Sequence, residues 1–279
     1  MQSESLKPAL TRREISHLIR SEWRDILRRS GVAPCTPPKS ARILGASHKT
    51  DLSLAIGRKT GVAYLAPSGE AWGSIGKRTT CANAIPACIR NCLGVTSGRM
   101  VMTPVRNARL WKTALRFGRP DLFAALVKLD ATALEREAAK LSLAPRIRLD
   151  GSTDLGDSER YAGSFPGIGW YEYTKSEARA RRWLDSPIPN LHSTLSYTAA
   201  THNACLRFVA DGGNVAVATD LAKTDIKPSA LWGFPAIDGD AHDDRSADAP
   251  GAFVLLSWKG PRSGLDTADG FAARIRCAS

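Results

Sequence analysis

The sequence predicts an α/β fold: a closed or partial (β/α) barrel with mostly parallel strands and an N-terminal helical extension. After residue 146, short apolar runs alternate with segments of helical periodicity. Such alternation is typical of a parallel sheet with right-handed crossovers. At least seven strands are expected, which favours a closed or nearly closed barrel over a doubly wound sheet. A chain of 279 residues is long enough for one domain of this kind.

The first 45 residues are expected to form a helix and a proline-rich linker outside the barrel-like domain, which takes residues 46–279. Apolar residues recur at helical spacing over residues 10–29. Thr11 and Glu14 make a capping box at the start of this helix. Residues 31–39 contain three prolines and are expected to be a linker.

The domain should begin with two short strands and continue with two helices. The strands are expected at residues 52–56 and 62–65. The helices are expected at 105–117 and 120–143, the second with proline in its first turn.

The second half supplies most of the expected sheet. Its strands are predicted at residues 146–149, 169–173, 193–197, 215–218, 235–237 and 253–258. Helices are predicted at 176–184 and 199–209, and residues 245–250 are expected to be a surface loop.

The positive charge is large and unevenly placed. The formal net charge is +12, and residues 71–120 contain nine Lys or Arg without any Asp or Glu. A concentrated positive field attracts phosphates, so nucleic acid, DNA rather than RNA, is the expected partner. A solvated basic face is the alternative. The candidate contacts are Lys77, Arg78, Arg99, Arg106, Arg109 and Lys112.

Polar residues follow the predicted strands. Because parallel strands of a barrel end at one rim, Asp150, Lys175, His192 and Lys259 are expected on the same rim, with Asp154 near Asp150. Groups that converge from different strands can act in acid–base catalysis. The ordinary alternatives are turn and cap chemistry for the aspartates and a satisfied core histidine for His192.

An acidic cluster follows the strand at 235–237. Asp238, Asp240 and His242 stand within a run of four aspartates and one histidine, residues 238–244. Oxygen-rich groups of this kind suit Mg²⁺ or Mn²⁺. A solvated acidic loop fits the pattern equally well.

Cys81, Cys88 and Cys92 form the third candidate site. Three closely spaced thiols can hold three irons of a [4Fe–4S] cluster and leave the fourth iron open. Zinc is the competing metal and requires a fourth ligand, for which Cys35, Cys205, Cys277 or a histidine is available. Three buried thiols without a metal are the remaining alternative.

Two resemblances bear on these motifs. A three-cysteine loop after an early strand of an α/β barrel resembles the radical S-adenosylmethionine enzymes, although their motif has three and then two intervening residues and this one has six and three. The segments ACIRNCLGVTSGRM, VRNARLWKT, RLDGSTD, YEYTK, GGNVAVA and IDGDAHDDR together resemble a phage and plasmid family known as gene-product-eighty-eight-like, from about residue 52 to 271. The first resemblance implies an iron–sulfur cluster with S-adenosylmethionine, and the second implies a mobile-element setting.

Three functions therefore remain open. The first is an enzyme that acts on nucleic acid or a nucleotide through an iron–sulfur site at the strand ends. The second is a divalent-metal-dependent nuclease or phosphoesterase that uses the cluster at residues 238–244. The third is a nucleic-acid-binding protein without catalysis. No apolar run is long enough to cross a bilayer and no secretion signal is visible, so a cytoplasmic protein with reduced thiols is expected.

Overall fold

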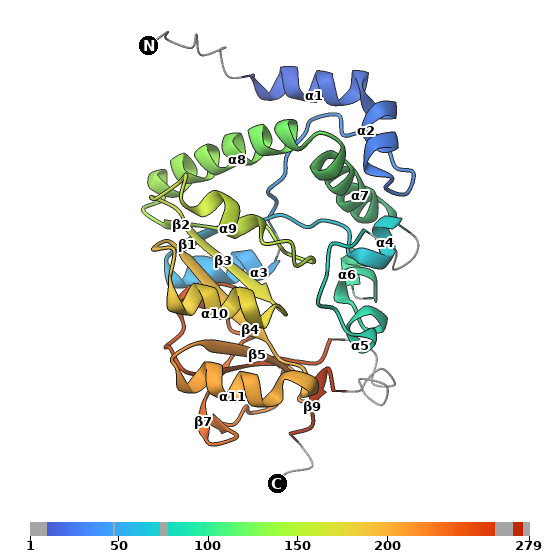
Figure 1. The fold of residues 1–279 in the computed structure, drawn as a ribbon. Helices are drawn as coiled ribbons and strands as arrows, with labels where there is room; N and C mark the ends of the chain where they lie inside the picture. Colours follow the sequence, from blue (N-terminus) through green and yellow to red (C-terminus); the bar gives the residue numbers. More distant parts are fainter. Residues whose placement is uncertain (1–9, 47, 73–77, 97, 260–269, 276–279) are drawn as a thin grey trace.

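An open, mostly parallel sheet forms the centre of the computed structural model, which describes residues 10–46, 48–72, 78–96, 98–259 and 270–275 (Figure 1). The strands lie in the order β1-β2-β3-β4-β5-β8-β7-β6, and β9 also pairs with β5. All pairs are parallel except β6 with β7. The strands are β1 (Arg58–Val62), β2 (Ala144–Arg148), β3 (Gly169–Thr174), β4 (Leu191–Ser196), β5 (Asn214–Thr219), β6 (Ala230–Leu231), β7 (Phe234–Asp238), β8 (Phe253–Ser257) and β9 (Ala272–Ala273).

The α/β class with a parallel sheet is thus confirmed, whereas closure of the barrel is not. The strand path has β1 at one end and β6 at the other, and no pairing among the described residues joins them. The helices are α1 (Arg12–Ser21), α2 (Trp23–Ser30), α3 (His48–Leu52), α4 (Ser68–Trp72), α5 (Pro86–Arg90), α6 (Leu93–Thr96), α7 (Thr103–Gly118), α8 (Pro120–Lys140), α9 (Asp157–Ala162), α10 (Glu177–Asp185) and α11 (His202–Ala210). The 3-10 turns are η1 (Ser53–Ile56), η2 (Gly98–Val101), η3 (Ala199–Thr201) and η4 (Arg245–Ala247).

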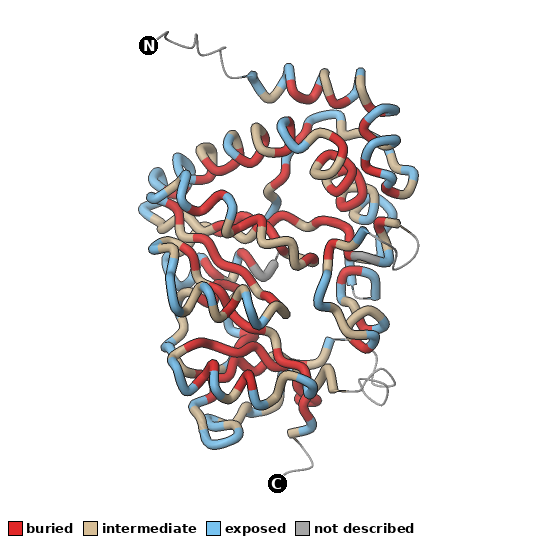
Figure 2. The backbone as a smooth tube through the Cα atoms, viewed as in Figure 1, coloured by how far each residue is buried: buried red, intermediate tan, exposed pale blue. Residues whose placement is uncertain are grey.

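The face of the sheet that carries the helices, here the outer face, is mostly apolar. Alternate residues of a strand point to opposite faces, so Ile147 and Trp170 share one face through their parallel pairing. Both belong to a buried core with α1, α2, α7 and α8, and a second core packs β5 and β8 against α11. Figure 2 shows the resulting band of buried backbone through the sheet.

The opposite face, here the inner face, is polar over the first four strands. The register places Thr60 beside Arg146, Tyr171 beside His192, and Tyr173 beside Thr194 on this face. Parallel sheets are usually apolar on both faces because both are covered. The polarity of the inner face is therefore a feature to explain.

The connection between β7 and β8 covers the inner face. β8 lies between β5 and β7, so the chain moves back along the sheet when it passes from β7 to β8. A right-handed crossover in that direction must pass over the face opposite to the earlier helices. The hydroxyl of Tyr171 accordingly donates to Asp243 of this connection over 2.9 Å.

Several boundaries differ from the sequence predictions. The helix expected at 10–29 is two helices that meet at Glu22, although its capping box is confirmed. Residues 53–56 form a 3-10 turn rather than a strand. Gly57 follows the turn in the left-handed conformation, with φ 74°. The first strand is β1, which begins before the strand predicted at 62–65. The sequence pattern did not reveal it because Arg58 and Lys59 are charged. The predicted surface loop at 245–250 is wrong at its start, where Arg245 is fully buried.

The N-terminal helices share the core of the domain. Ile15, Ile19 and Ile26 are fully buried in the same cluster as Phe123 and Trp170. The division at residue 45 stays a prediction. None of the described helices combines the length and the apolar character needed to span a bilayer.

Candidate functional site

Three thiols line one cavity beside the ends of β1, β2 and β3. Cys81 forms a parallel bridge with Asp154, which follows β2, and Cys88 lies in α5. Pro86 opens α5 at a position where a helix needs no backbone donor, and Cys92 comes two residues after the end of that helix. The cavity has a volume of about 370 Å³, and Cys81, Cys88 and Cys92 all contribute to its wall. Pockets for small ligands commonly start at about 300 Å³.

Burial favours the protonated form of two of these thiols, Cys88 and Cys92. It raises the pKa of Cys92 to about 11, and the neighbouring Cys88 and Cys81 add to that shift while the charge of Arg109 opposes it. Burial also raises the pKa of Cys88, which Lys175 lowers and Asp154 raises. Any metal that binds here must displace thiol protons, because the thiolate is the ligand.

A charged wall completes the cavity. Arg109 of α7 is 1% exposed and donates to both oxygens of Glu70 at 2.8 and 2.5 Å. It also donates to the carbonyl of Met100 over 2.9 Å. Arg106 lies one turn earlier, approaches Glu70 at 3.4 Å and is 54% exposed. Two guanidiniums for one carboxylate leave this wall positive.

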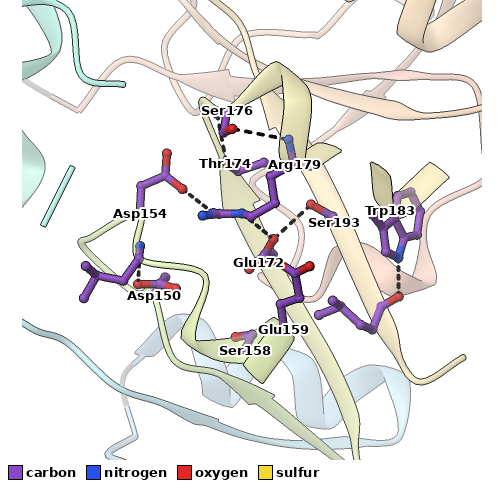
Figure 3. A network of polar contacts seen from close by, with 12 residues as sticks. Asp150, Asp154, Ser158, Glu159, Glu172, Thr174, Ser176, Arg179, Trp183 and Ser193 are labelled. Atoms are coloured by element: carbon purple, nitrogen blue, oxygen red, sulfur yellow. Dashed lines mark hydrogen bonds and ion pairs between the residues drawn. The ribbon is translucent and has the colours of Figure 1, made fainter. Parts of the chain in front are cut away.

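A polar network supports the cavity from the sheet side (Figure 3). The guanidinium of Arg179 from α10 joins Asp154 to Glu172 of β3, and the distance to Glu172 is 3.2 Å. Ser193 of β4 donates to the same Glu172 oxygen over 3.2 Å. Asp154 also accepts the backbone N–H of Lys175 over 2.9 Å. The loop that bridges to Cys81 is thus tied directly to α10 and to the residue that follows β3, and through Arg179 to Glu172.

Asp150 has the role of a structural cap. Its carboxylate accepts from the Thr153 hydroxyl over 2.7 Å and from the backbone N–H groups of Leu155 and Asp157 at 3.0 Å each. Burial, followed by the charge of Asp157, raises the pKa of Asp150. The turn and cap alternative therefore describes what this residue does in the structure.

The four residues expected on one rim do not share it. Asp150, Lys175 and Lys259 follow the carboxyl ends of β2, β3 and β8. His192 is the second residue of β4 and lies toward the opposite edge, so the expectation is wrong for it. The alternation of polar residues in this strand did not reveal where the strand begins. Burial lowers the pKa of His192 to about 4, which leaves the ring neutral.

The acidic cluster is dispersed among basic partners. Lys227 lies 2.7 Å from Asp238 and 3.2 Å from Asp240, and Lys259 lies 3.2 Å from Asp240. Burial alone would raise the pKa of Asp240, but hydrogen bonds from Ser257 and these lysines hold it below its ordinary value. Arg245 contacts the ring of His242 at 2.9 Å. Counter-ions from the protein itself explain how these carboxylates coexist.

The predicted basic contacts separate into exposed and buried groups. Arg78, Arg99 and Arg106 are exposed, although Arg78 also donates to the carbonyls of Arg29 and Ser30. Arg109 is buried against Glu70 and does not offer its guanidinium to a partner. Burial lowers the pKa of Lys112 to about 8, against the charge of Asp130. Lys77 lies outside the described residues.

Among the residues that the structure describes, no three His, Cys, Asp or Glu side chains are arranged to share one ion. A cluster does not require that arrangement, because each cysteine ligates a different iron. Of the fourth ligands considered for zinc, Cys35 and Cys205 do not line the cavity and Cys277 lies outside the described residues. Cys35, Cys81, Cys88, Cys92 and Cys205 are outside any disulfide bond.

Comparison with models of known protein families shows to which family the chain belongs. The model of the family described as gene product 88 matches residues 40–277, nearly the whole domain. The chain belongs to the gene product 88 family. The comparisons with curated proteins and with solved structures found no match. In this gene product 88 member, the match begins after α2, includes all three cavity cysteines and ends beyond β9.

Two residues of this family member were missed by sequence reasoning. Glu70 is the last acidic residue before the acid-free segment at 71–120, and that position is a signal for its pairing with Arg109. Arg179 stands among other charged residues of α10, and nothing local marks it as the partner of Asp154 and Glu172.

Proposed function

We propose that this protein binds a [4Fe–4S] cluster through Cys81, Cys88 and Cys92, with S-adenosylmethionine at the open iron, and modifies nucleic acid or a nucleotide. The observation that carries the proposal is the convergence of the three thiols on one cavity. The position at the carboxyl ends of parallel strands adds support, because ligands of such sheets bind there. When bound, the cluster and S-adenosylmethionine supply one-electron and radical chemistry.

The residues around the cysteines suit an anionic group. Arg109 stands beside Cys92 and its charge favours the thiolate form. Lys175 acts in the same direction on Cys88, and its ammonium lies 5.0 Å from the centre of the Phe271 ring. Cationic neighbours lower the free energy of three clustered thiolates. They oppose the effect of burial, which keeps the pKa values of Cys88 and Cys92 raised, and so ease the loss of the thiol protons when a metal binds.

The exposed cations next to the cavity support an anionic substrate. Arg106 lines the cavity and is half-exposed, and Arg99 is exposed in the neighbouring turn η2. Both are available for phosphate groups, whereas the carboxylates of the alternative nuclease site are neutralised by lysines. The arrangement therefore favours the cluster-dependent enzyme over the nuclease.

The test is the spectrum and iron content of protein purified without oxygen. We expect a brown protein with broad absorption near 400 nm, roughly where thiolate-ligated iron absorbs. The Cys88→Ala variant should lose most of its iron. Added S-adenosylmethionine should change the electron paramagnetic resonance signal of the reduced wild-type protein.

The matched control is Cys205→Ala, because Cys205 is a buried thiol of α11 that does not line the cavity. This variant should keep its iron. A colourless protein that contains stoichiometric zinc, or equal iron in the Cys88→Ala and wild-type proteins, would refute the cluster.

A further inference from the structure

The inner face of the sheet carries an unusual concentration of buried positive charge. Arg58 of β1 and Arg146 and Arg148 of β2 are 18%, 20% and 15% exposed, and the strand register puts all three on this face. Arg245 of η4, in the segment that covers this face, is fully buried and pairs with Asp248. A guanidinium in such a place requires a closely bound anion.

Two adjacent carboxylates of the chain occupy that position. Asp243 accepts from the Tyr171 hydroxyl over 2.9 Å and lies 3.3 Å from Arg148. Asp244 forms ion pairs with Arg58 and, at 3.1 Å, with Arg146. Both carboxylates belong to the covering segment at residues 239–251, which connects β7 to β8.

The carboxylates do not satisfy the groups around them. Four arginines, Arg58, Arg146, Arg148 and Arg245, meet three aspartates, Asp243, Asp244 and Asp248, so positive charge is in excess. Among the described residues, the buried Nε of Arg245, Nε2 of His192 and Oγ1 of Thr194 have no hydrogen-bond partner. A buried donor or acceptor left unpaired in this way destabilises the folded protein.

Glycines bound the covering segment. Gly251 has φ 73°, a conformation that side chains rarely adopt. A Cβ at Gly239 would lie 2.7 Å from Val254 and from Leu256 of β8, so the segment can lie close to the strand only with glycine there. The segment is thus joined to the sheet at both ends by residues that allow its backbone to follow a tight path.

We propose that the inner face is a binding site for a diphosphate group, and that Asp243 and Asp244 occupy it in the ligand-free protein. Two neighbouring phosphates match the two adjacent carboxylates, and each offers more acceptor oxygens to the unpaired donors. Arginine forks and tyrosine hydroxyls are the groups that bind phosphate most strongly. The site is separate from the cysteine cavity, and the proposal does not depend on the cluster.

The test uses inorganic pyrophosphate and the Asp243→Asn/Asp244→Asn double variant. We expect the variant to melt several degrees below wild type, and saturating pyrophosphate to restore most of that loss through binding to the folded state. By calorimetry, pyrophosphate should bind this variant at least tenfold more tightly than wild type, because no carboxylate has to be displaced.

The controls separate this site from general charge effects. Adding Arg146→Gln to the double variant should abolish the rescue, whereas adding Arg182→Gln, which alters an exposed arginine paired with Glu159, should preserve it. Sodium chloride at equal ionic strength should not rescue. If the double variant does not fold, Asp243→Asn alone is used, and its affinity for pyrophosphate should exceed that of wild type. Absence of rescue, or rescue that survives Arg146→Gln, would overturn the proposal.

Discussion

The Glu172 carboxyl, at the centre of the network in Figure 3, is a buried acid that titrates near neutrality. Burial raises its pKa to about 7, although Arg179 opposes the shift. The folded protein therefore binds a proton that the unfolded chain has already lost, and stability falls as the pH rises from about 4.5 to 7. The maximum loss is of order 3 kcal/mol.

The Glu172→Gln variant should remove this loss. We expect its free energy of unfolding, relative to wild type, to rise between pH 5 and pH 8 in urea denaturation. Thr174→Val is the matched control, because Thr174 lies on the same face of β3, is equally buried and does not ionise over this range. A constant difference between Glu172→Gln and wild type across this range would contradict the prediction.

Single residues were predictable where local spacing decides their environment. Cys81, Cys88 and Cys92 stand close in sequence. The short helix α5 carries Cys88 and ends two residues before Cys92, and Cys81 reaches the same cavity beside its bridge to Asp154. The burial of Arg109 was not predictable in this way. It depends on Glu70, which precedes it by 39 residues and approaches only in the folded chain.

At the scale of elements, the close contact between α2 and α7 depends on one glycine. A Cβ at Gly118 would lie 2.5 Å from the carbonyl oxygen of Ile26, and backbone cannot move aside as a side chain can. Gly118→Ala should therefore destabilise the protein by about 1–3 kcal/mol. Gly163→Ala is the control, because nothing lies within 4 Å of a Cβ there. Equal unfolding free energies for the two variants would show that the helices separate without cost.

The positions of the helices and strands could be predicted from hydrophobic periodicity where one face of the element is apolar. α8 and strands β2, β3, β4, β5, β7 and β8 were predicted near their actual bounds, because apolar residues of the outer face alternate with polar positions, whereas the two-residue strands β6 and β9 were not predicted. The strand predicted at 62–65 begins several residues after the start of β1. Arg58 and Thr60 point to a polar inner face, so their strand lacks the alternation that a half-buried strand normally shows.

At the scale of the whole molecule, the net charge of +12 predicts DNA binding that weakens steeply with salt. The exposed Arg99 and Arg106 are the expected phosphate contacts beside the cavity. Replacing both with Gln should weaken binding similarly for all sequences and reduce the slope of log affinity against log salt by about 2. Fluorescence anisotropy with labelled duplexes measures both quantities.

Arg207→Gln provides the matched control, because Arg207 is exposed on α11, away from the residues that line the cavity. It should leave the slope unchanged. If the control and the Arg99→Gln/Arg106→Gln variant lose affinity equally, DNA contacts the whole basic surface and not the cavity rim.

The strand order was beyond sequence reasoning. The alternation of strands and helices predicted parallel pairing, but it did not predict that β8 lies between β5 and β7. Nothing in residues 253–257 distinguishes a strand at the end of a sheet from one inserted between two earlier strands, because both are apolar and buried. The return over the inner face, and with it the polar site there, follows from that insertion.

The late position of β8 in the chain has a consequence for biosynthesis. β5 and β7 leave the ribosome before the strand that lies between them and joins them. Until residues 253–257 have emerged, the nascent sheet has a gap with unpaired backbone groups on both sides. A translational pause before that point would leave edges that can pair with other chains, so chaperone protection should matter most until residues 253–257 have left the ribosome.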